Sequence, residues 1–134
     1  EVTAAMSSAY DGGPFDSAPW RLVEHGHAGG GADSDRSFTE DEPHQWLSID
    51  LGPGRSLRLT HYALRHGNTY GGQLRSWRLE GSHDGSQWAP LKTHEGDESM
   101  PHRQGWCVGD WAVEMAETWL VEDGGDRRAT VSSR

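Results

Sequence analysis

The sequence predicts an all-β domain, and three features support this assignment. Short apolar runs alternate with polar residues at a period of two, as in half-buried strands. Eighteen glycines lie mostly between these runs, where they favour turns. Only 33% of the 134 residues are hydrophobic, so the core must rely on a few large side chains, and the seven tryptophans are the candidates. A chain of this length suits a single domain.

The N-terminal part carries little regular pattern. Residues 1–19 mix Ala, Ser, Gly and Pro and are expected to be irregular, whereas residues 20–23 form a short strand-like patch. Residues 25–42 are rich in Gly and acidic side chains, which is the composition of a long loop. Its carboxylates could gather a calcium ion, but their spacing is not that of an EF-hand, so a solvated acidic loop is the preferred interpretation and structural calcium stays open. These carboxylates are Asp33, Asp35, Asp41 and Glu42.

Two strands are expected next. In residues 46–51, Leu47, Ile49 and Leu51 alternate with polar residues, and Gly52-Pro53-Gly54 ends the strand as a turn. Residues 57–64 form the following strand, with a less regular alternation. That irregularity would fit a strand covered on both faces or one that carries a bulge.

Residues 74–91 predict a β-hairpin. Trp77 and Leu79 point to one face while Arg78 and Glu80 point to the other, and Trp88 and Leu91 resume the apolar pattern after a tight turn. The turn consists of His83-Asp84-Gly85, because Asp bonds its own backbone and Gly accepts a positive φ. The tryptophans at 46, 77 and 88 are expected in the core, since each lies on an alternating strand.

The C-terminal part is expected to end the fold. Residues 106–115 could make one more strand or a short helix. Residues 122–134 combine Gly124-Gly125, Arg127-Arg128 and a Ser-rich end, and are expected to be a disordered tail. The expected domain therefore covers residues 20–121.

Charge and composition exclude several partners. A net charge of −9 argues against nucleic acid, whose binding requires a basic surface. No apolar run is long enough for a membrane span, so no membrane insertion is expected. Cys107 is the single cysteine, which excludes an internal disulfide and favours a reducing, intracellular location.

Catalytic and metal sites find little support. Ser82, His83 and Asp84 are consecutive within a turn, where adjacent side chains cannot form a hydrogen-bonded catalytic relay. His25 and His27 could present two imidazoles together, but a single cysteine removes the common four-ligand zinc arrangements. The expectation is therefore a non-catalytic chain that needs no metal ion or cofactor.

The loop of residues 65–73 is the candidate binding site. It combines a forked guanidinium donor, imidazole and amide groups and one aromatic face, the elements of a small polar-ligand or peptide site. The alternative, weighed equally, is that Arg65 and His66 are strand-end residues that hold the loop by hydrogen bonds. The candidate residues are Arg65, His66, Asn68 and Tyr70.

Three ordered motifs carry a family resemblance: 44–52 (HQWLSIDLG), 62–66 (YALRH) and 75–82 (RSWRLEGS) followed by Asp84-Gly85 and Trp88. Residues 20–98 resemble the discoidin domain, also called the coagulation factor V/VIII type C domain. The motifs are most similar to the intracellular branch found in BTB-domain proteins and HECT-type ubiquitin ligases. The two closing strands of the family, one with a Phe-Arg pair and one rich in Glu, are not found after Met100, so residues 100–121 match poorly.

The resemblance implies a galactose-binding-like jelly roll, a β-sandwich of two antiparallel sheets with ligand loops at one end. It also implies a non-catalytic recognition module that is part of a larger protein. This module would bind a protein or peptide, and the larger protein could be a ubiquitin ligase. The alternative implied by lectin-like relatives is carbohydrate binding. Fold alone does not decide between these ligands.

Overall fold

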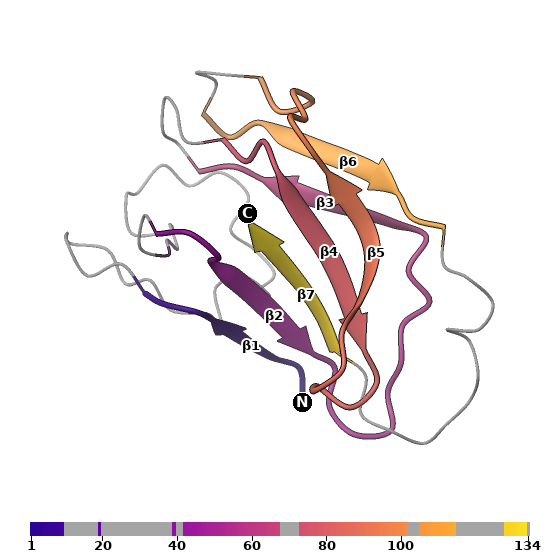
Figure 1. Cartoon of the computed structure of the whole chain (residues 1–134). Coiled ribbons are helices and arrows are strands. Elements are labelled where there is room, and N and C mark those ends of the chain that lie inside the picture. Colours follow the sequence, from indigo (N-terminus) through magenta and orange to yellow (C-terminus); the bar gives the residue numbers. More distant parts are fainter. Residues whose placement is uncertain are drawn as a thin grey trace.

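The computed structural model describes residues 1–9, 19, 39, 42–67, 73–101, 105–114 and 128–133, and within them the fold is all-β. The strands are β1 (Thr3–Met6), β2 (Trp46–Asp50), β3 (His61–Arg65), β4 (Trp77–Ser82), β5 (Ala89–His94), β6 (Val108–Ala112) and β7 (Arg128–Ser133). They form two antiparallel sheets, one of five strands in the order β1-β2-β7-β4-β5 and one of the two strands β3 and β6 (Figure 1). The predicted all-β fold of antiparallel sheets is confirmed.

The two sheets pack through aromatic rings. Trp111 of β6 meets Trp77 of β4 edge to face, with ring centroids 5.0 Å apart. Tyr62 of β3 lies 5.1 Å from Trp111, so β3 and β6 form a second layer over the β4–β5 part of the larger sheet (Figure 1). Trp77, Met100 and Cys107 are the buried centre of this core, with Leu64 and Leu74 packed against it. The prediction of a core dominated by a few large side chains holds for Trp77.

Both ends of the chain enter the five-stranded sheet. β7 lies between β2 and β4, where Val131 pairs with Leu47 on one side and Leu79 on the other. The disordered tail expected for residues 122–134 is therefore wrong for residues 128–133. A sheet ladder uses backbone hydrogen bonds, and a short segment with Thr and Val forms one despite polar neighbours that suggest disorder. β1 likewise falls within residues 1–19, which were expected to be irregular.

The predicted hairpin is formed by β4 and β5. Trp77 and Leu79 are buried while Arg78 and Glu80 are more exposed, and a register shift follows Leu79. The connection spans residues 83–88 and is wider than the tight turn expected.

Ser82 and Asp84, with the backbone of residues 85–87, form what we call the turn cluster. Asp84 Oδ1 accepts hydrogen bonds from the backbone N–H of Ser86 at 2.8 Å and of Gln87 at 2.9 Å. Ser82 Oγ donates to the same carboxylate atom at 3.0 Å, and Gly85 has φ of 73°. The predicted turn chemistry of Asp84 and Gly85 is confirmed.

Other strands differ from the sequence predictions in their limits. β3 begins only at His61, and Leu57, expected inside a strand, is 55% exposed. This explains the irregular alternation, because only Tyr62 and Leu64 of β3 turn inward. Trp46 was expected in the core but is 39% exposed, because it is the first residue of β2 and lies at the end of the sheet. Residues 108–112 adopt the strand rather than the helix alternative.

Candidate binding site

One end of the sandwich, which we call the loop end, gathers several connecting segments. β3 and β5 end here, and β4 and β6 begin here (Figure 1). The described segments are residues 65–67, 73–76, 95–101 and 105–108. Because these segments come from both sheets, the loop end is where the fold brings distant parts of the sequence together.

Arg65 and Trp106 form the most prominent contact on its surface. The Arg65 guanidinium carbon lies 4.8 Å from the centroid of the Trp106 ring, within the range of a cation–π interaction. Arg65 also pairs in register with Val108, which is 56% exposed. A cation, an aromatic ring and an apolar side chain therefore lie side by side at the ends of β3 and β6.

The backbone holds this surface in place. The N–H of His66 donates to the carbonyl of Cys107 at 2.9 Å, and the N–H of Trp106 donates to the carbonyl of Gly67 at 3.2 Å. Trp106 has φ of 60°, a conformation that a bulky residue adopts only where its surroundings impose it. Strained backbone conformations of this kind cluster at functional sites. The backbone of Trp106 therefore indicates that the loop end is a candidate functional site.

The predicted site residues divide into three groups. Arg65 is exposed, and its guanidinium lies over the Trp106 ring. His66 is half-buried, and its Nδ1–H donates to the carbonyl of Gly67 at 2.8 Å, which is the loop-holding role left open by the sequence. Asn68 and Tyr70 lie outside the described residues. The structure thus brings Arg65 to the surface and uses His66 to fix the backbone beside it.

Sequence reasoning did not select Trp106 and Val108 as site residues. Both were assigned to one more strand or a short helix, because they belong to the apolar pattern of residues 106–115. Trp106 follows a polar stretch and a glycine, and that position at the start of the strand was the available signal.

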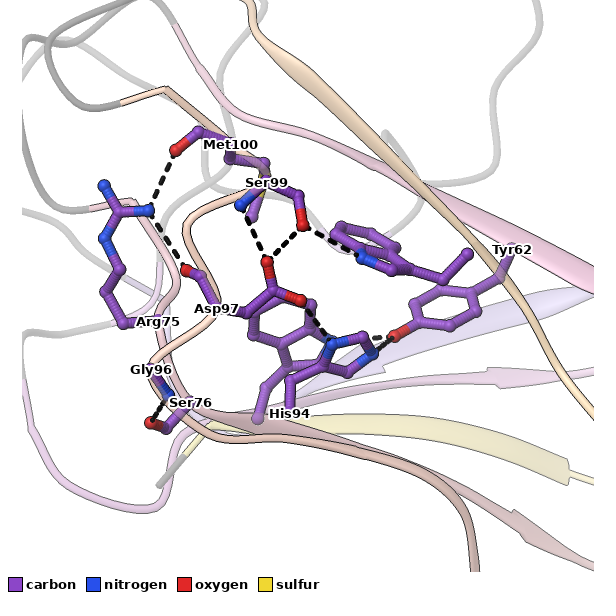
Figure 2. Close-up of polar contacts among 10 residues, drawn as sticks. Tyr62, Arg75, Ser76, His94, Gly96, Asp97, Ser99 and Met100 are labelled. Carbon is purple, nitrogen blue, oxygen red and sulfur yellow. Dashed lines mark hydrogen bonds and ion pairs between the residues drawn. The ribbon is translucent and has the colours of Figure 1, made fainter.

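A hydrogen-bonded set of side chains joins the two sheets and the loop after β5. It consists of Tyr62, Trp77, His94, Asp97 and Ser99, and we call it the network cluster (Figure 2). The indole N–H of Trp77 donates to the Tyr62 hydroxyl at 2.9 Å. The Tyr62 hydroxyl is 2.6 Å from His94 Nε2, and His94 Nδ1 is 2.6 Å from Asp97 Oδ2. Ser99 binds the other carboxylate oxygen of Asp97 through its backbone N–H, at 2.7 Å, and through its hydroxyl.

Donor and acceptor roles in the network cluster follow from its two ends. An indole nitrogen only donates, so the Tyr62 oxygen accepts from Trp77 and its own hydrogen is free for His94 Nε2. An ionised carboxylate only accepts, so His94 carries its proton on Nδ1 and donates it to Asp97. Every hydrogen bond of the chain is thereby satisfied with Tyr62 as the phenol and Asp97 as the carboxylate.

The electrostatics agree with this assignment. Burial would raise the pKa of Asp97, but the hydrogen bonds from Ser99 and His94 outweigh it and lower the pKa to about 2. Burial raises the pKa of Tyr62, against the hydrogen bond from Trp77 and together with the nearby charge of Asp97. Asp97 is thus held as the anion and Tyr62 as the neutral phenol.

The network cluster positions the loop of residues 95–101 rather than offering a reactive group. His94 is 6% exposed, its ring stacks on Trp77 at 4.0 Å and 9°, and both its nitrogens are occupied. Arg75 Nη1 donates to the carbonyls of Asp97 at 3.1 Å and Met100 at 2.9 Å (Figure 2). The loop is therefore fixed both by Arg75 and by His94.

The described residues contain neither a group of side chains that could hold a metal ion nor a helix that could cross a membrane. In the part of the chain that the structure describes, no group of three or more His, Cys, Asp or Glu side chains could hold a metal ion. Of the possible calcium ligands, Asp33, Asp35 and Asp41 lie outside that part. Within it, no helix has both the length and the apolar character needed to cross a bilayer.

The sequence is similar to short stretches of much larger proteins. A 63-residue segment is 46% identical to the E3 ubiquitin-protein ligase Ufd4 of Drosophila melanogaster, covering 46% of this chain and 2% of that ligase. Over 63 residues the chain is 36% identical to the E3 ubiquitin-protein ligase hecd-1 of Caenorhabditis elegans, covering 46% of this chain and 2% of the ligase. A 55-residue segment is 34% identical to a BTB/POZ domain-containing protein of Arabidopsis thaliana, covering 41% and 7%.

No family model matches the chain. The chain spans at most 7% of the length of these three relatives, so it corresponds to a small part of each. The sequence analysis predicted a resemblance to ubiquitin-ligase and BTB-domain proteins, and the similarity to short stretches of such proteins agrees with that prediction. The assignment to a discoidin domain is not tested by it.

Proposed function

We propose that the loop end is a protein- or peptide-recognition surface of a discoidin-type module within a larger, ubiquitin-ligase-related chain inside the cell. The observation that carries this proposal is the surface made by Arg65, Trp106 and Val108 on a backbone held by hydrogen bonds between the end of β3 and the start of β6. Trp and Arg are the residue types most enriched among binding hot spots, and apolar neighbours exclude water around them. The similarity to short stretches of two E3 ligases supports the cellular context.

The form of the surface favours a protein ligand over a glycan. A small-molecule or sugar site is usually a concavity that encloses much of its ligand. A hollow of about 390 Å³ among the described residues is lined by residues 51 and 54–57, which follow β2 at the other end of the sandwich. At the loop end, Arg65 already covers one face of the Trp106 ring, which leaves less aromatic surface for a sugar to stack on.

Carbohydrate binding is the second candidate. The observation in its favour is an aromatic ring beside Arg65 and His66, the combination that lectin-like sites use. Glycan-array binding that disappears in Trp106→Ala would support this candidate and contradict the peptide proposal.

Peptide selection tests the proposal directly. The probe is a random seven-residue peptide library displayed on phage, followed by affinity measurement for synthetic copies of the selected peptides. Arg65→Ala and Trp106→Ala are each expected to weaken binding at least about tenfold, as hot-spot residues do. The matched control is Arg58→Ala, an exposed arginine before β3, which leaves the affinity unchanged. Equal affinities for Arg65→Ala and Arg58→Ala, or a library that yields no binder, would contradict the proposal.

A further inference from the structure

The two-stranded sheet of β3 and β6 turns one face to solvent. In both strands, buried or half-buried residues alternate with exposed ones, and successive side chains of a strand point to opposite faces. The exposed residues of the two strands therefore share one face, which we call the outer face. Its members, given as pairs across the two strands, are His61 and Ala112, Ala63 and Asp110, and Arg65 and Val108. The outer face thus continues from the surface that Arg65 and Val108 form at the loop end.

Arg65 and Asp110 carry opposite charges on the outer face but do not pair with each other. Asp110 follows Val108, the residue opposite Arg65, so the two charged residues lie diagonally across the strands. The Arg65 guanidinium carbon lies 4.8 Å from the centroid of the Trp106 ring. The guanidinium is therefore directed toward the start of β6, whereas Asp110 lies farther along that strand. Within the described part of the chain, neither side chain forms an ion pair.

The two charges are complementary to a partner that carries the opposite pair. A guanidinium over an aromatic ring still presents its N–H edge, which matches a carboxylate with two parallel hydrogen bonds. The carboxylate of Asp110 accepts hydrogen bonds from a Lys or Arg side chain. Ala63, which lies opposite Asp110, presents only a methyl group, so a partner can approach the sheet closely here. The outer face therefore fits a partner with one acidic and one basic residue.

The spacing of the charges indicates the conformation of the partner. Each residue of a strand advances the chain by about 3.3 Å, so Arg65 and Asp110 are offset by about 7 Å along the strands. The direction of Arg65 toward Trp106 lengthens this offset. In an extended segment every second side chain points the same way, and such side chains are again about 7 Å apart. An extended segment lying along β3 and β6 can therefore present its two charges from positions two or four apart.

We propose that the outer face binds an extended segment of a partner protein, in which an acidic residue bonds Arg65 and a basic residue, two or four positions away, bonds Asp110. This inference rests on the proposed function and adds to it the conformation and the charge pattern of the partner. Complementary charges of this kind fix the register of a partner and suppress wrong partners. Trp106 and Val108 supply the apolar contact, and the two charges supply the selectivity.

Charge reversal tests the role of Asp110. The probes are peptides selected from the seven-residue library, which are too short to form stable helices. An acidic and a basic position, two or four apart, should recur among them. Asp110→Lys should weaken their binding at least about tenfold, because two like charges then face each other. Replacing the basic residue of the peptide with Glu should restore the affinity for Asp110→Lys to within about threefold of the original pair.

Glu42→Lys is the matched control for Asp110→Lys. Glu42 is exposed and precedes β2, so this substitution changes the net charge by the same amount outside the β3–β6 sheet. It should leave the peptide affinities within about twofold of the parent, which separates local pairing from long-range attraction. If Asp110→Lys folds poorly by thermal unfolding, Asp110→Asn measured with peptides that carry Gln in place of the basic residue provides the same cycle.

Three outcomes would overturn the inference. Peptides that need Arg65 and Trp106 but bind Asp110→Lys and Asp110→Asn as tightly as the parent would overturn the role of Asp110 and leave the proposed function standing. Acidic and basic positions at an odd separation would overturn the extended arrangement, because such side chains point to opposite sides. A library without binders would contradict the proposed function and this inference together.

Discussion

Two clusters of polar side chains lie at opposite ends of the β4–β5 hairpin, and each contains an aspartate with a lowered pKa. In the turn cluster, hydrogen bonds from the backbone of Gln87 and Ser86 lower the pKa of Asp84, which is fully exposed. In the network cluster, bonds from Ser99 and His94 lower the pKa of Asp97 in spite of burial. The turn cluster uses residues adjacent in sequence to shape one connection. The network cluster joins β3, β4, β5 and the loop after β5, and so determines how the two sheets meet.

The two clusters show that a sequence that looks catalytic need not form a side-chain relay. Ser82-His83-Asp84 resembles a triad in sequence, yet its Ser and Asp bond each other and the turn backbone. Tyr62 is 32 residues from His94 in the sequence and lies in the other sheet, yet its hydroxyl is 2.6 Å from His94 Nε2, and His94 Nδ1 is 2.6 Å from Asp97 Oδ2. Contact between sheets, rather than proximity in sequence, creates the relay.

The largest expected effect compares a histidine from each end of the hairpin. His94→Ala leaves the Tyr62 hydroxyl and the Asp97 carboxylate without a partner and uncovers Trp77, so it should lower the free energy of unfolding by about 3 kcal/mol. His83→Ala, at the turn, should change it by less than about 0.5 kcal/mol. Chemical denaturation of the two variants measures the difference. Equal losses would mean that the network cluster contributes no more than the turn.

A smaller loss of stability is expected from a substitution next to Trp111, whose ring packs against the network cluster. A Cβ at Gly109 would lie 2.1 Å from the Trp111 ring, which is itself held against Tyr62, Trp77 and His94. Gly109→Ala should therefore destabilise the protein by about 2 kcal/mol, as overpacking does.

The matched control for Gly109 is Gly67→Ala. A Cβ at Gly67 would meet nothing within 4 Å, so the substitution should be neutral or slightly stabilising. Thermal unfolding of both variants gives the comparison. A stable Gly109→Ala protein would show that the Trp111 ring moves freely, and that the contact between the sheets is not rigid.

The smallest expected effect is acid sensitivity. The pKa of Asp97 is about 2 in the folded protein and 3.8 ordinarily, so the unfolded chain takes up its proton first as the pH falls. The stabilisation by Asp97 is therefore complete above about pH 4 and is lost between pH 4 and pH 2, amounting to on the order of 1 kcal/mol after screening by solvent.

Two serine variants assign this acid sensitivity to one end of the hairpin. Ser99→Ala should raise the pKa of Asp97, because it removes a hydrogen bond to the carboxylate. Ser86→Ala alters the turn cluster and should leave Asp97 unaffected. NMR titration of the Asp97 carboxyl carbon distinguishes them, and an unchanged midpoint in Ser99→Ala would contradict the hydrogen-bond explanation.

The predictable parts of the fold are those whose signal is local. Trp77 and Leu79 alternate with charged residues, and Asp84-Gly85 carries its own turn chemistry, so the hairpin could be predicted from a few consecutive residues. β7 could not, because its place between β2 and β4 depends on backbone pairing with partners that are distant in sequence. Its flanking glycines and arginines gave the opposite indication.

The same limit applies to the candidate site. Arg65 was selected because of its residue type at the end of a strand. Trp106 was not, because its ring reaches Arg65 only through the pairing of β3 with β6.

An amide chemical-shift map most directly tests whether the loop end, rather than the hairpin turn, is the recognition surface. A peptide selected from the library is added to the labelled protein and the shift changes are mapped along the chain. We expect the largest changes in residues 65–67, 73–76 and 105–108, with none in the turn cluster at residues 82–87. Changes concentrated in residues 82–87, or around residues 51–57 at the same end, would contradict the assignment of binding to the loop end.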